Sequence, residues 1–276
     1  MGDEGLGGGL RSVVPKELCE SAVADRAVPQ AELGEWRERF GLVAGVTERP
    51  FSLGFWTDEP VATVMGRWRS FRDAFRPGFG ALQKSHQVHG ATVLWHEGVG
   101  QGWHVADAAD GHATVQQGLL LGVTVADCVP VYLTSRDGAA VALLHAGWRG
   151  TAGCILEAGV RLLHERAKVS PADVVMHCGV GICGPCYEVG EEVGRAVLGP
   201  EAKAGKQRLD LRAALARQAE ELGVGEVTIS SLCTSCHHDR FFSHRASGGK
   251  DGRMIAYLGI PRSLSLGQPG GAPGLP

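Results

Sequence analysis

The sequence predicts a mixed α/β fold in which strands and helices alternate along one large domain. Apolar, β-rich runs alternate with segments of helical periodicity over most of the chain. In the middle, two strand runs at 129–133 and 139–144 are joined by a short polar connector that ends in Asp137-Gly138. Because such a direct reversal pairs antiparallel neighbours, the sheet is not wholly parallel. At 276 residues and 44% hydrophobic composition, the chain is long enough to bury a sizeable core.

Local patterns predict the other elements in chain order. Pro60 opens a helix, and Asp210 and Gly223 are the N-cap and the stop signal of another. Apolar residues at helical spacing predict a third helix directly after the hairpin. The predicted helices are 60–75, 151–168 and 209–222, and the predicted strands outside the hairpin are 42–46, 91–95, 119–125, 174–178, 226–229 and 254–258.

Composition argues against several classes of protein. The formal net charge is -3 and Lys and Arg do not cluster, so no nucleic-acid partner is predicted. The first residues lack the basic and apolar regions of a signal peptide, and no apolar run reaches membrane-spanning length. We therefore predict a cytoplasmic protein with no membrane partner. Its eight cysteines are then expected to be reduced thiols rather than a disulfide framework.

The hairpin places a thiol and an imidazole at its open end, because Cys128 precedes the first strand run and His145 follows the second. Reversal about Arg136 and Asp137 would set these two residues directly opposite each other. A two-residue turn at Asp137-Gly138 would instead set His145 opposite Pro130, with Cys128 diagonal to it. Side chains alternate with period two, so either register keeps both groups on one face. The pair could begin a metal site or form a cysteine nucleophile with its base.

A third metal donor is available just before the strand predicted at 91–95, where His86 and His89 stand three residues apart. Spacing does not choose between them. Two imidazoles and one thiolate leave one position of a tetrahedral zinc site open, as is typical of a catalytic site. The same donors are chemically able to take copper.

Four more cysteines form two C-x-x-C pairs, Cys183 with Cys186 and Cys233 with Cys236. The first pair could be a redox pair, or the two pairs could be the halves of a structural zinc site. Buried thiols around a Gly184-Pro185 turn are the simplest interpretation.

Several short motifs follow one another along the chain. In chain order they are Gln87-Val88-His89-Gly90, Ala126-Asp127-Cys128-Val129-Pro130, His145-Ala146-Gly147-Trp148-Arg149-Gly150, Cys186-Tyr187-Glu188-Val189-Gly190, and Phe241-Phe242-Ser243 with Gly252-Arg253-Met254. Together they resemble the laccase-domain family, whose members carry the name multicopper polyphenol oxidase and are described as zinc-dependent purine nucleoside phosphorylases. The resemblance runs from about residue 42 to residue 260 and is most specific in the second and third motifs.

The resemblance implies a single domain with two central mixed sheets flanked by helices, in four layers ordered α/β/β/α. It implies a catalytic domain at 39–261, preceded by a partly disordered N-terminal extension at 1–38 and followed by a disordered Gly/Pro tail at 262–276. By position in the motifs, the zinc ligands become His89, Cys128 and His145. The implied activities are phosphorolysis of adenosine, inosine and S-methyl-5'-thioadenosine with phosphate, and adenosine deamination, by a monomer or small homo-oligomer.

Four residues near these ligands are catalytic candidates: Arg149, Arg245, Asp127 and Cys128 itself. The planar guanidinium groups of the two arginines suit phosphate, whose oxygens they bind in pairs. A zinc ion with this donor set lowers the pKa of a bound water toward neutrality, and the resulting hydroxide could attack C6 of adenine. Phosphorolysis instead needs cations that hold phosphate while it attacks the anomeric carbon of the ribose.

The chain departs from the family pattern in two places. The family's T-R-x-G-G and S-L-N-L-G elements correspond here only to Thr47-Glu48-Arg49 and Ser52-Leu53-Gly54. After the Phe-Phe-Ser element the family has Tyr-Arg-Arg, and this chain has His244-Arg245-Ala246.

Two other classes of function stay open. Copper-dependent oxidation of phenols is disfavoured, because multicopper oxidases use many histidines, often in His-x-His pairs, and the sequence contains no such pair. A Cys128 and His145 nucleophile-base pair would instead serve an amidase, and some family members are linked to editing of cell-wall precursors.

Overall fold

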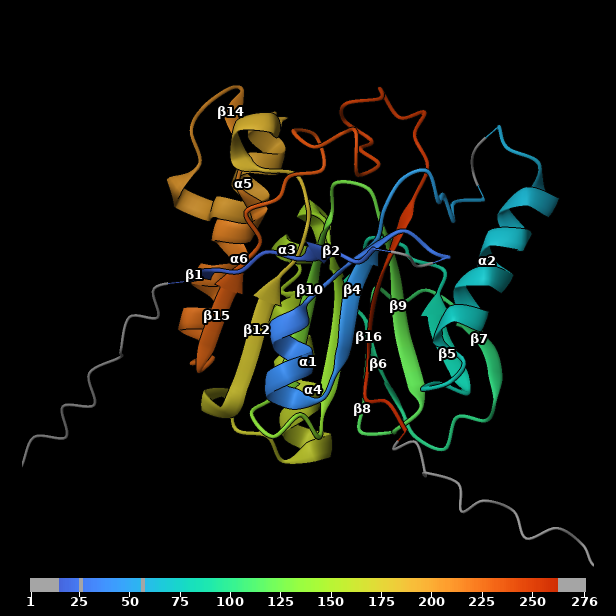
Figure 1. Ribbon diagram of the computed structural model, residues 1–276. Coiled ribbons are helices and arrows are strands. Elements are labelled where there is room, and N and C mark those ends of the chain that lie inside the picture. Colours follow the sequence, from blue (N-terminus) through green and yellow to red (C-terminus); the bar gives the residue numbers. More distant parts are fainter. Residues whose placement is uncertain (1–14, 25–26, 56–57, 263–276) are drawn as a thin grey trace, which may run out of the picture.

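The computed structural model describes residues 15–24, 27–55 and 58–262, and its centre is a pair of seven-stranded mixed sheets (Figure 1). The first sheet has the order β1 (Lys16–Glu17), β15 (Glu226–Ile229), β12 (Val174–Cys178), β10 (Val129–Ser135), β11 (Val141–Ala146), β8 (Gly111–Thr114) and β6 (Val93–His96). The second has the order β2 (Ser21–Ala22), β3 (Gln30–Glu32), β4 (Val43–Thr47), β16 (Met254–Gly259), β9 (Leu119–Val125), β5 (Ala81–Ser85) and β7 (Gly102–Ala106). A small ribbon joins β13 (Glu188–Val189) to β14 (Gln207–Arg208).

Six α-helices are assigned within the described residues, and three of them cover the outer faces of the sheets. They are α1 (Gly34–Phe40), α2 (Val61–Phe75), α3 (Trp148–Ala152), α4 (Ile155–Ala167), α5 (Glu191–Leu198) and α6 (Leu211–Glu221). Buried residues of α4 and α6 share a core with the first sheet, and those of α2 share another with the second. A third core lies between the sheets, where Leu121 and Leu258 pack with Leu143 and Tyr132. The predicted α/β/β/α order of four layers is confirmed.

Of the two registers predicted for the hairpin of β10 and β11, the structure has the one expected for a turn at Asp137-Gly138. Pro130 pairs with His145 and Val129 with Ala146, so Cys128 stands diagonal to His145. Alternation along β11 puts His145 on the same face as Val141 and Leu143, which belong to the core between the sheets. The imidazole therefore lies at the end of the space between the two sheets.

Most predicted strands and helices are present, and one predicted helix is divided into two. The strands at 119–125, 174–178 and 226–229 have the predicted bounds, whereas the strand expected at 91–95 is β6, two residues later at its start. The helix expected at 151–168 is wrong as a single element. It is two helices, α3 and α4, separated at Cys154, whose φ of 58° lies in the left-handed region.

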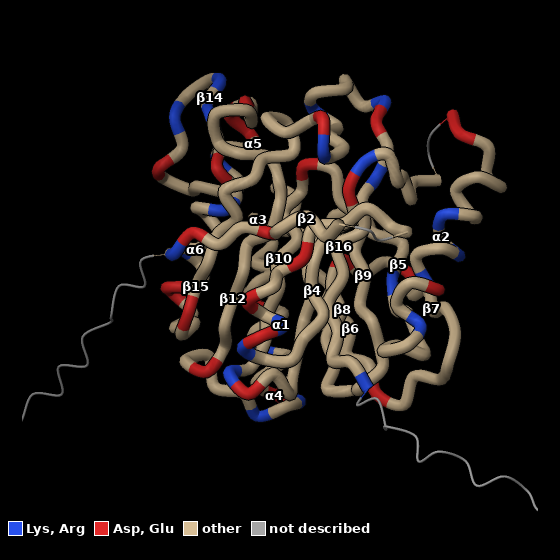
Figure 2. Tube along the Cα trace, viewed as in Figure 1, with Lys and Arg blue, Asp and Glu red and all other residues tan. Residues whose placement is uncertain are grey.

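Residues 15–38 contribute β1, β2, β3 and the start of α1, and β1 and β3 pair with β15 and β4 of the two sheets. The expected disorder of the Gly-rich start and of the Gly/Pro tail falls at 1–14 and 263–276, outside the described residues. Within the described part of the chain, no helix has the length and apolar character needed to span a membrane. In Figure 2, Lys and Arg are interspersed with Asp and Glu, mainly on helices and loops.

The core between the sheets predicts the cost of truncating Leu143. This side chain is 0% exposed, and Leu143→Ala should lower the free energy of unfolding by about 2–5 kcal/mol, because it leaves a cavity between two rigid layers. Val105→Ala on β7, whose side chain is 62% exposed, is the control and should change stability by less than about 0.5 kcal/mol. Urea unfolding followed by circular dichroism measures both. Equal effects of the two substitutions would contradict the packing described here.

Candidate metal centre and substrate pocket

One thiol and two imidazoles converge at the open end of the hairpin. The donor atoms of His89, Cys128 and His145 all lie within 4.8 Å of one another. Cys128 comes directly before β10 and His145 is the penultimate residue of β11, while His89 is on the loop between β5 and β6. Of the two histidines that the sequence left open, His89 joins this group and His86 lines the pocket beside it.

The loop that carries His89 is held by one buried carboxylate. Asp110, which is 0% exposed and precedes β8, accepts hydrogen bonds from three consecutive backbone N–H groups, at 3.2 Å from Val88, 2.9 Å from His89 and 2.7 Å from Gly90. These bonds hold His89 at a φ of 58°, in the left-handed region.

The same carboxylate orients His145. Its Oδ1 lies 2.9 Å from Nδ1 of His145, and the backbone N–H of His145 donates to the carbonyl of Asp110 at 2.7 Å. When Nδ1–H donates to the carboxylate, the lone pair of Nε2 is left for a metal ion, as in the carboxylate–histidine–metal arrangement. Asp110 is thus a positioning residue for two of the three donors.

The position of Gly147 keeps space open beside the donors. A Cβ at this residue would lie 2.9 Å from Sγ of Cys128 and 3.5 Å from Cδ2 of His89. The donor set and this cradle fit zinc, which prefers imidazole and thiolate ligands in tetrahedral sites. With three protein donors, the fourth position stays available.

The charges of the donors are coupled. Burial favours the neutral thiol, but His145 and His89 outweigh it and lower the pKa of Cys128 to about 6. Burial also favours the neutral imidazole, but Cys128 and Asp110 raise the pKa of His145 to about 9. The thiol and the imidazole thus favour each other's charged forms. A metal ion binds the thiolate and the neutral imidazole, so its binding displaces the protons that these two groups hold.

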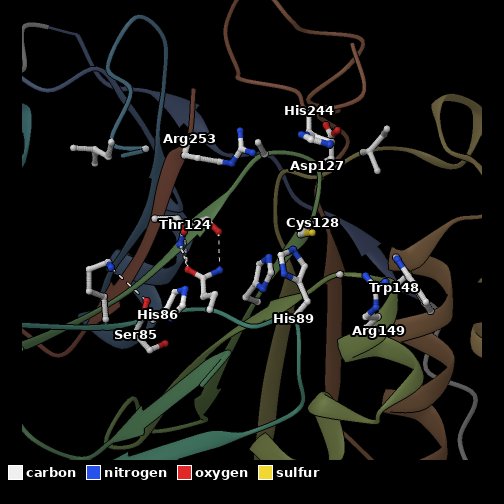
Figure 3. Close-up of a pocket in the computed structure, with 18 of the residues that line it drawn as sticks. Ser85, His86, His89, Thr124, Asp127, Cys128, Trp148, Arg149, His244 and Arg253 are labelled. Carbon is white, nitrogen blue, oxygen red and sulfur yellow. Dashed lines mark hydrogen bonds between the residues drawn. The ribbon is translucent and has the colours of Figure 1, made fainter. Parts of the chain in front are cut away.

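A cavity of about 890 Å³ opens over the three donors (Figure 3). Its apolar wall includes Leu53, Phe55 and Trp68, and the Phe55 and Trp68 rings stack with their planes 6° apart and centroids 6.3 Å apart. This volume is in the range of sites that bind small molecules.

Three arginines line the cavity. Arg149 is exposed at the start of α3, with its guanidinium carbon 4.2 Å from the centre of the Trp148 ring. Arg245 is also exposed and donates to the carbonyl of Glu188 at 2.8 Å, and its guanidinium lies over Tyr187. Arg253 is partly buried and donates to the carbonyl oxygens of Asp251 and Gly252 at 2.8 Å.

The side chain of Asp127 reaches away from the donors and binds the segments that close the cavity. Its carboxylate accepts hydrogen bonds from the hydroxyls of Thr234 at 2.6 Å and Ser243 at 2.7 Å, and from the backbone N–H of Arg245 at 2.6 Å. These three partners bind both oxygens of the carboxylate, two at Oδ1 and one at Oδ2. Asp127 thus fixes the loop that carries His244 and Arg245.

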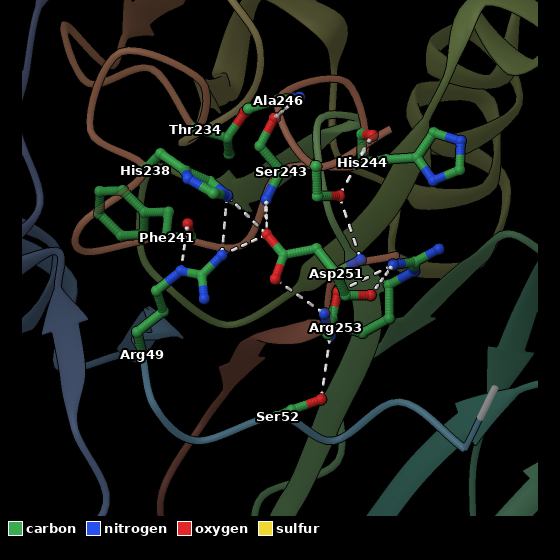
Figure 4. Close-up of polar contacts among 12 residues, drawn as sticks. Arg49, Ser52, Thr234, His238, Phe241, Ser243, His244, Ala246, Asp251 and Arg253 are labelled. Carbon is green, nitrogen blue, oxygen red and sulfur yellow. Dashed lines mark hydrogen bonds and ion pairs between the residues drawn. The ribbon is translucent and has the colours of Figure 1, made fainter. Parts of the chain in front are cut away.

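Asp251 holds the far end of this loop (Figure 4). Its carboxylate accepts from the backbone N–H of Ser243 at 2.9 Å, lies 2.8 Å from Nε2 of His238 and pairs with the guanidinium of Arg49. Arg49 belongs to the segment that departs from the family's T-R-x-G-G pattern, so this segment contacts the loop that carries His244 and Arg245.

Sequence reasoning missed Asp110 and did not single out Arg253, Tyr187 or the aromatic pair of Phe55 and Trp68. Asp110 stands in an Asp-Gly dipeptide, which by itself predicts a turn. Arg253 stands in the Gly252-Arg253-Met254 motif, which by itself assigns it no role. The pocket wall comes from segments far apart in the chain, and no local pattern connects them.

Comparison with known proteins identifies one matching family model, and relatives and solved structures with similar sequences and folds. The family model described as multi-copper polyphenol oxidoreductase laccase matches residues 38–261. Purine nucleoside phosphorylase YlmD of Geobacillus stearothermophilus is 37% identical over 191 residues, or 63% of this chain and 70% of that protein. The crystal structure of YlmD from the same organism superposes with a TM-score of 0.79 and 29% identity, over 88% of this chain and 98% of that chain.

Of two further relatives, one has the same activity in its name and one has a different activity. Purine nucleoside phosphorylase of Deinococcus radiodurans is 33% identical over 246 residues, or 86% of this chain and 90% of that protein. Adenosine deaminase RL5 of an unknown prokaryotic organism is 37% identical over 169 residues, or 56% of this chain and 63% of that protein. Because the family model spans most of the chain and YlmD has the same fold, the protein belongs to the multi-copper polyphenol oxidoreductase laccase family.

Proposed function

We propose that this protein is a zinc-dependent purine nucleoside phosphorylase that acts on adenosine, inosine and S-methyl-5'-thioadenosine, and that it also deaminates adenosine. The observation that carries the proposal is the group of His89, Cys128 and His145 at a cavity lined by arginines and aromatic rings. The names of the relatives support it: two are purine nucleoside phosphorylases, and one is an adenosine deaminase. A cytoplasmic location and a monomeric or small homo-oligomeric state stay predictions.

The residues divide the work of phosphorolysis between two parts of the cavity. Arg149 and Arg245, with Arg253 as a third cation, hold phosphate through paired N–H···O contacts and screen its charge. The flat rings of Phe55 and Trp68 offer the purine base an apolar surface. An oxygen of the phosphate attacks the anomeric carbon, and the bond from that carbon to the base nitrogen breaks. The base leaves with a proton that overall comes from the hydrogen phosphate ion, and the products are the free base and the 1-phosphate of the sugar.

His89, Cys128 and His145 would hold the zinc ion, and Asp110 keeps two of these donors in place. When bound, the zinc supplies a Lewis acid beside the substrate. In deamination water replaces phosphate as the nucleophile, adds at C6 of adenosine and displaces ammonia, which leaves inosine.

The donor groups argue against the two alternative functions. Among the described residues, the groups of three or more His, Cys, Asp or Glu that could hold a metal ion are this one and a group of four cysteines. Neither offers the several histidines of a three-copper oxidase centre. The Cys128, His145 and Asp110 series would also suit an amidase, but His89 adds a donor for which a nucleophile-base pair has no use.

The assignment of metal donors predicts the metal content of variants. His89→Ala and Cys128→Ala should each lower the zinc content by about one ion per chain, because two remaining donors bind zinc weakly. His86→Ala is the matched control, since His86 lines the same pocket from the same segment and lies outside the donor group. Inductively coupled plasma mass spectrometry of protein purified without added copper measures the content. Full zinc in Cys128→Ala would refute the assignment.

The two proposed activities predict different products from adenosine. With phosphate present, adenine and ribose 1-phosphate should appear, and without phosphate inosine should still form, because water takes the place of the nucleophile. Chromatography that separates adenine, inosine and hypoxanthine measures both. The products of a Cys128→Ala control should fall to background. Turnover of no nucleoside would favour the amidase or cell-wall alternatives, and oxidation of a phenol dependent on copper would favour the oxidase.

The proposed role of Arg149 predicts a change in phosphate dependence. Arg149→Gln should lower kcat/KM for phosphate by about 10- to 100-fold, which corresponds to the loss of one charged hydrogen-bonding group. Phosphate-independent deamination should change much less. Arg161→Gln, on the exposed surface of α4, is the control with the same chemical change. An equal loss of both activities in Arg149→Gln would contradict a role specific to phosphate.

A further inference from the structure

Of the seven cysteines that the proposed mechanism does not use, four come together next to residues that line the pocket. Cys183 precedes the short 3-10 turn at 184–186 and Cys186 is its last residue, while Cys233 and Cys236 lie in the segment after β15. Their sulfur atoms all lie within 4.8 Å of one another. Cys183 and Cys236 are 3.9 Å apart, and Cys186 and Cys236 are 3.5 Å apart.

These distances match the edges of a tetrahedron around zinc. With a Zn–S bond of about 2.3 Å, two sulfur ligands of one tetrahedral ion lie about 3.8 Å apart. A disulfide would bring one pair to about 2.05 Å and turn two of the sulfurs away from the others. We propose that Cys183, Cys186, Cys233 and Cys236 bind a second zinc ion, as a closed site of four thiolates.

The backbone around Cys233 is already arranged for a thiolate. Sγ of Cys233, a side chain only 3% exposed, accepts hydrogen bonds from the backbone N–H of Cys183 at 3.2 Å and of Cys236 at 3.4 Å. Such N–H···S contacts from the loops that carry the ligands stabilise a metal-bound thiolate and set its direction. The thiols lose their protons to solvent when the metal binds.

The two halves of the site are joined through the backbone as well. Gly181 forms an isolated parallel bridge with Cys233, and the N–H of Thr234 donates to the carbonyl of Gly181 at 3.2 Å. These backbone contacts fix the positions of the two cysteine pairs relative to each other. Four protein donors leave no position for substrate, so this ion is structural, unlike the one at His89, Cys128 and His145.

The second ion would brace the wall of the substrate pocket. One half of the cluster continues into Tyr187, which lines the cavity, and the other continues into Thr234, whose hydroxyl binds Asp127. The segments at 183–187 and 233–236 belong to neither of the large sheets, so the ion would hold together two segments that sheet hydrogen bonds do not fix.

The test measures zinc in the full chain under reducing conditions, with Cys128→Ala used to empty the first site. The unsubstituted chain should hold two zinc ions, and Cys128→Ala should hold one. Adding Cys186→Ser to Cys128→Ala should remove the remaining ion. Adding Cys154→Ser instead should leave it, because Cys154 is exposed and lies outside both donor groups. Circular dichroism checks that each variant is folded.

Spectroscopy keeps the test independent of folding in the serine variant. The Cys128→Ala chain reconstituted with cobalt(II) should show the intense visible bands of a tetrahedral ion and the near-ultraviolet charge transfer of thiolate ligands. X-ray absorption of its zinc form should show sulfur neighbours alone, at about 2.3 Å.

A Cys128→Ala chain that holds no zinc would overturn the proposal, as would a zinc spectrum with nitrogen or oxygen neighbours. Retention of the ion in the Cys186→Ser chain would overturn it too. A disulfide between Cys186 and Cys236 in protein kept under reductant, seen as the mass loss of two hydrogens, would replace it. None of these outcomes depends on nucleoside turnover, so the proposal and the proposed function fail separately.

Discussion

The buried carboxylate of Asp110 is the interaction on which the site depends. Four hydrogen-bond donors converge on it, three from the backbone at 88–90 and one from the ring of His145. A charge this deep in the protein is tolerated because these donors replace the water it loses, and they hold the pKa of Asp110 below its usual value against the effect of burial. The carboxylate thereby joins the loop between β5 of the second sheet and β6 of the first to strand β11 of the first sheet. Without this carboxylate, the left-handed backbone of His89 would lose the hydrogen bond that stabilises it. The ring of His145 would lose the bond that fixes its orientation.

Neighbouring residues at the start of β10 serve two different structures. Cys128 turns its thiol to the donors, while Asp127, at a φ of 87°, turns its carboxylate to Thr234 and Ser243. The candidate metal donors and the wall of the cavity are therefore attached to the chain at adjacent residues. A shift of the loops that bind Asp127 would reach Cys128 through one peptide unit, although Thr234 and Ser243 stand more than a hundred residues away in the chain.

Much of the framework could be predicted from the sequence because its central strands are buried on both faces and read as apolar runs, as in β9, β10 and β12. The short strands β5, β7 and β8 contain His, Gln, Lys and Gly and give no such signal. The break between α3 and α4 has one local signal, Gly153, which is the C-cap of α3. The left-handed residue that follows, Cys154, is not a glycine, and the apolar periodicity continues past both residues. In the site, the thiol and the imidazole of the hairpin could be placed from strand alternation alone. Asp110 could not, because its role consists of contacts with residues 20 and 35 positions away.

Gly147 imposes a constraint of a different kind on this chain. The donors set the identity of three positions by what their side chains do, whereas this position is set by having no side chain, since even a methyl group would lie 2.9 Å from the thiol. Its φ of -80° is accessible to every amino acid, so the backbone does not demand glycine here. Glycine is required here because the side chains of Cys128 and His89 occupy the space that a Cβ would need. In a directed-evolution library, position 147 would therefore behave as invariant although it supplies no atom to catalysis, and a search that scores residues by their functional groups would overlook it.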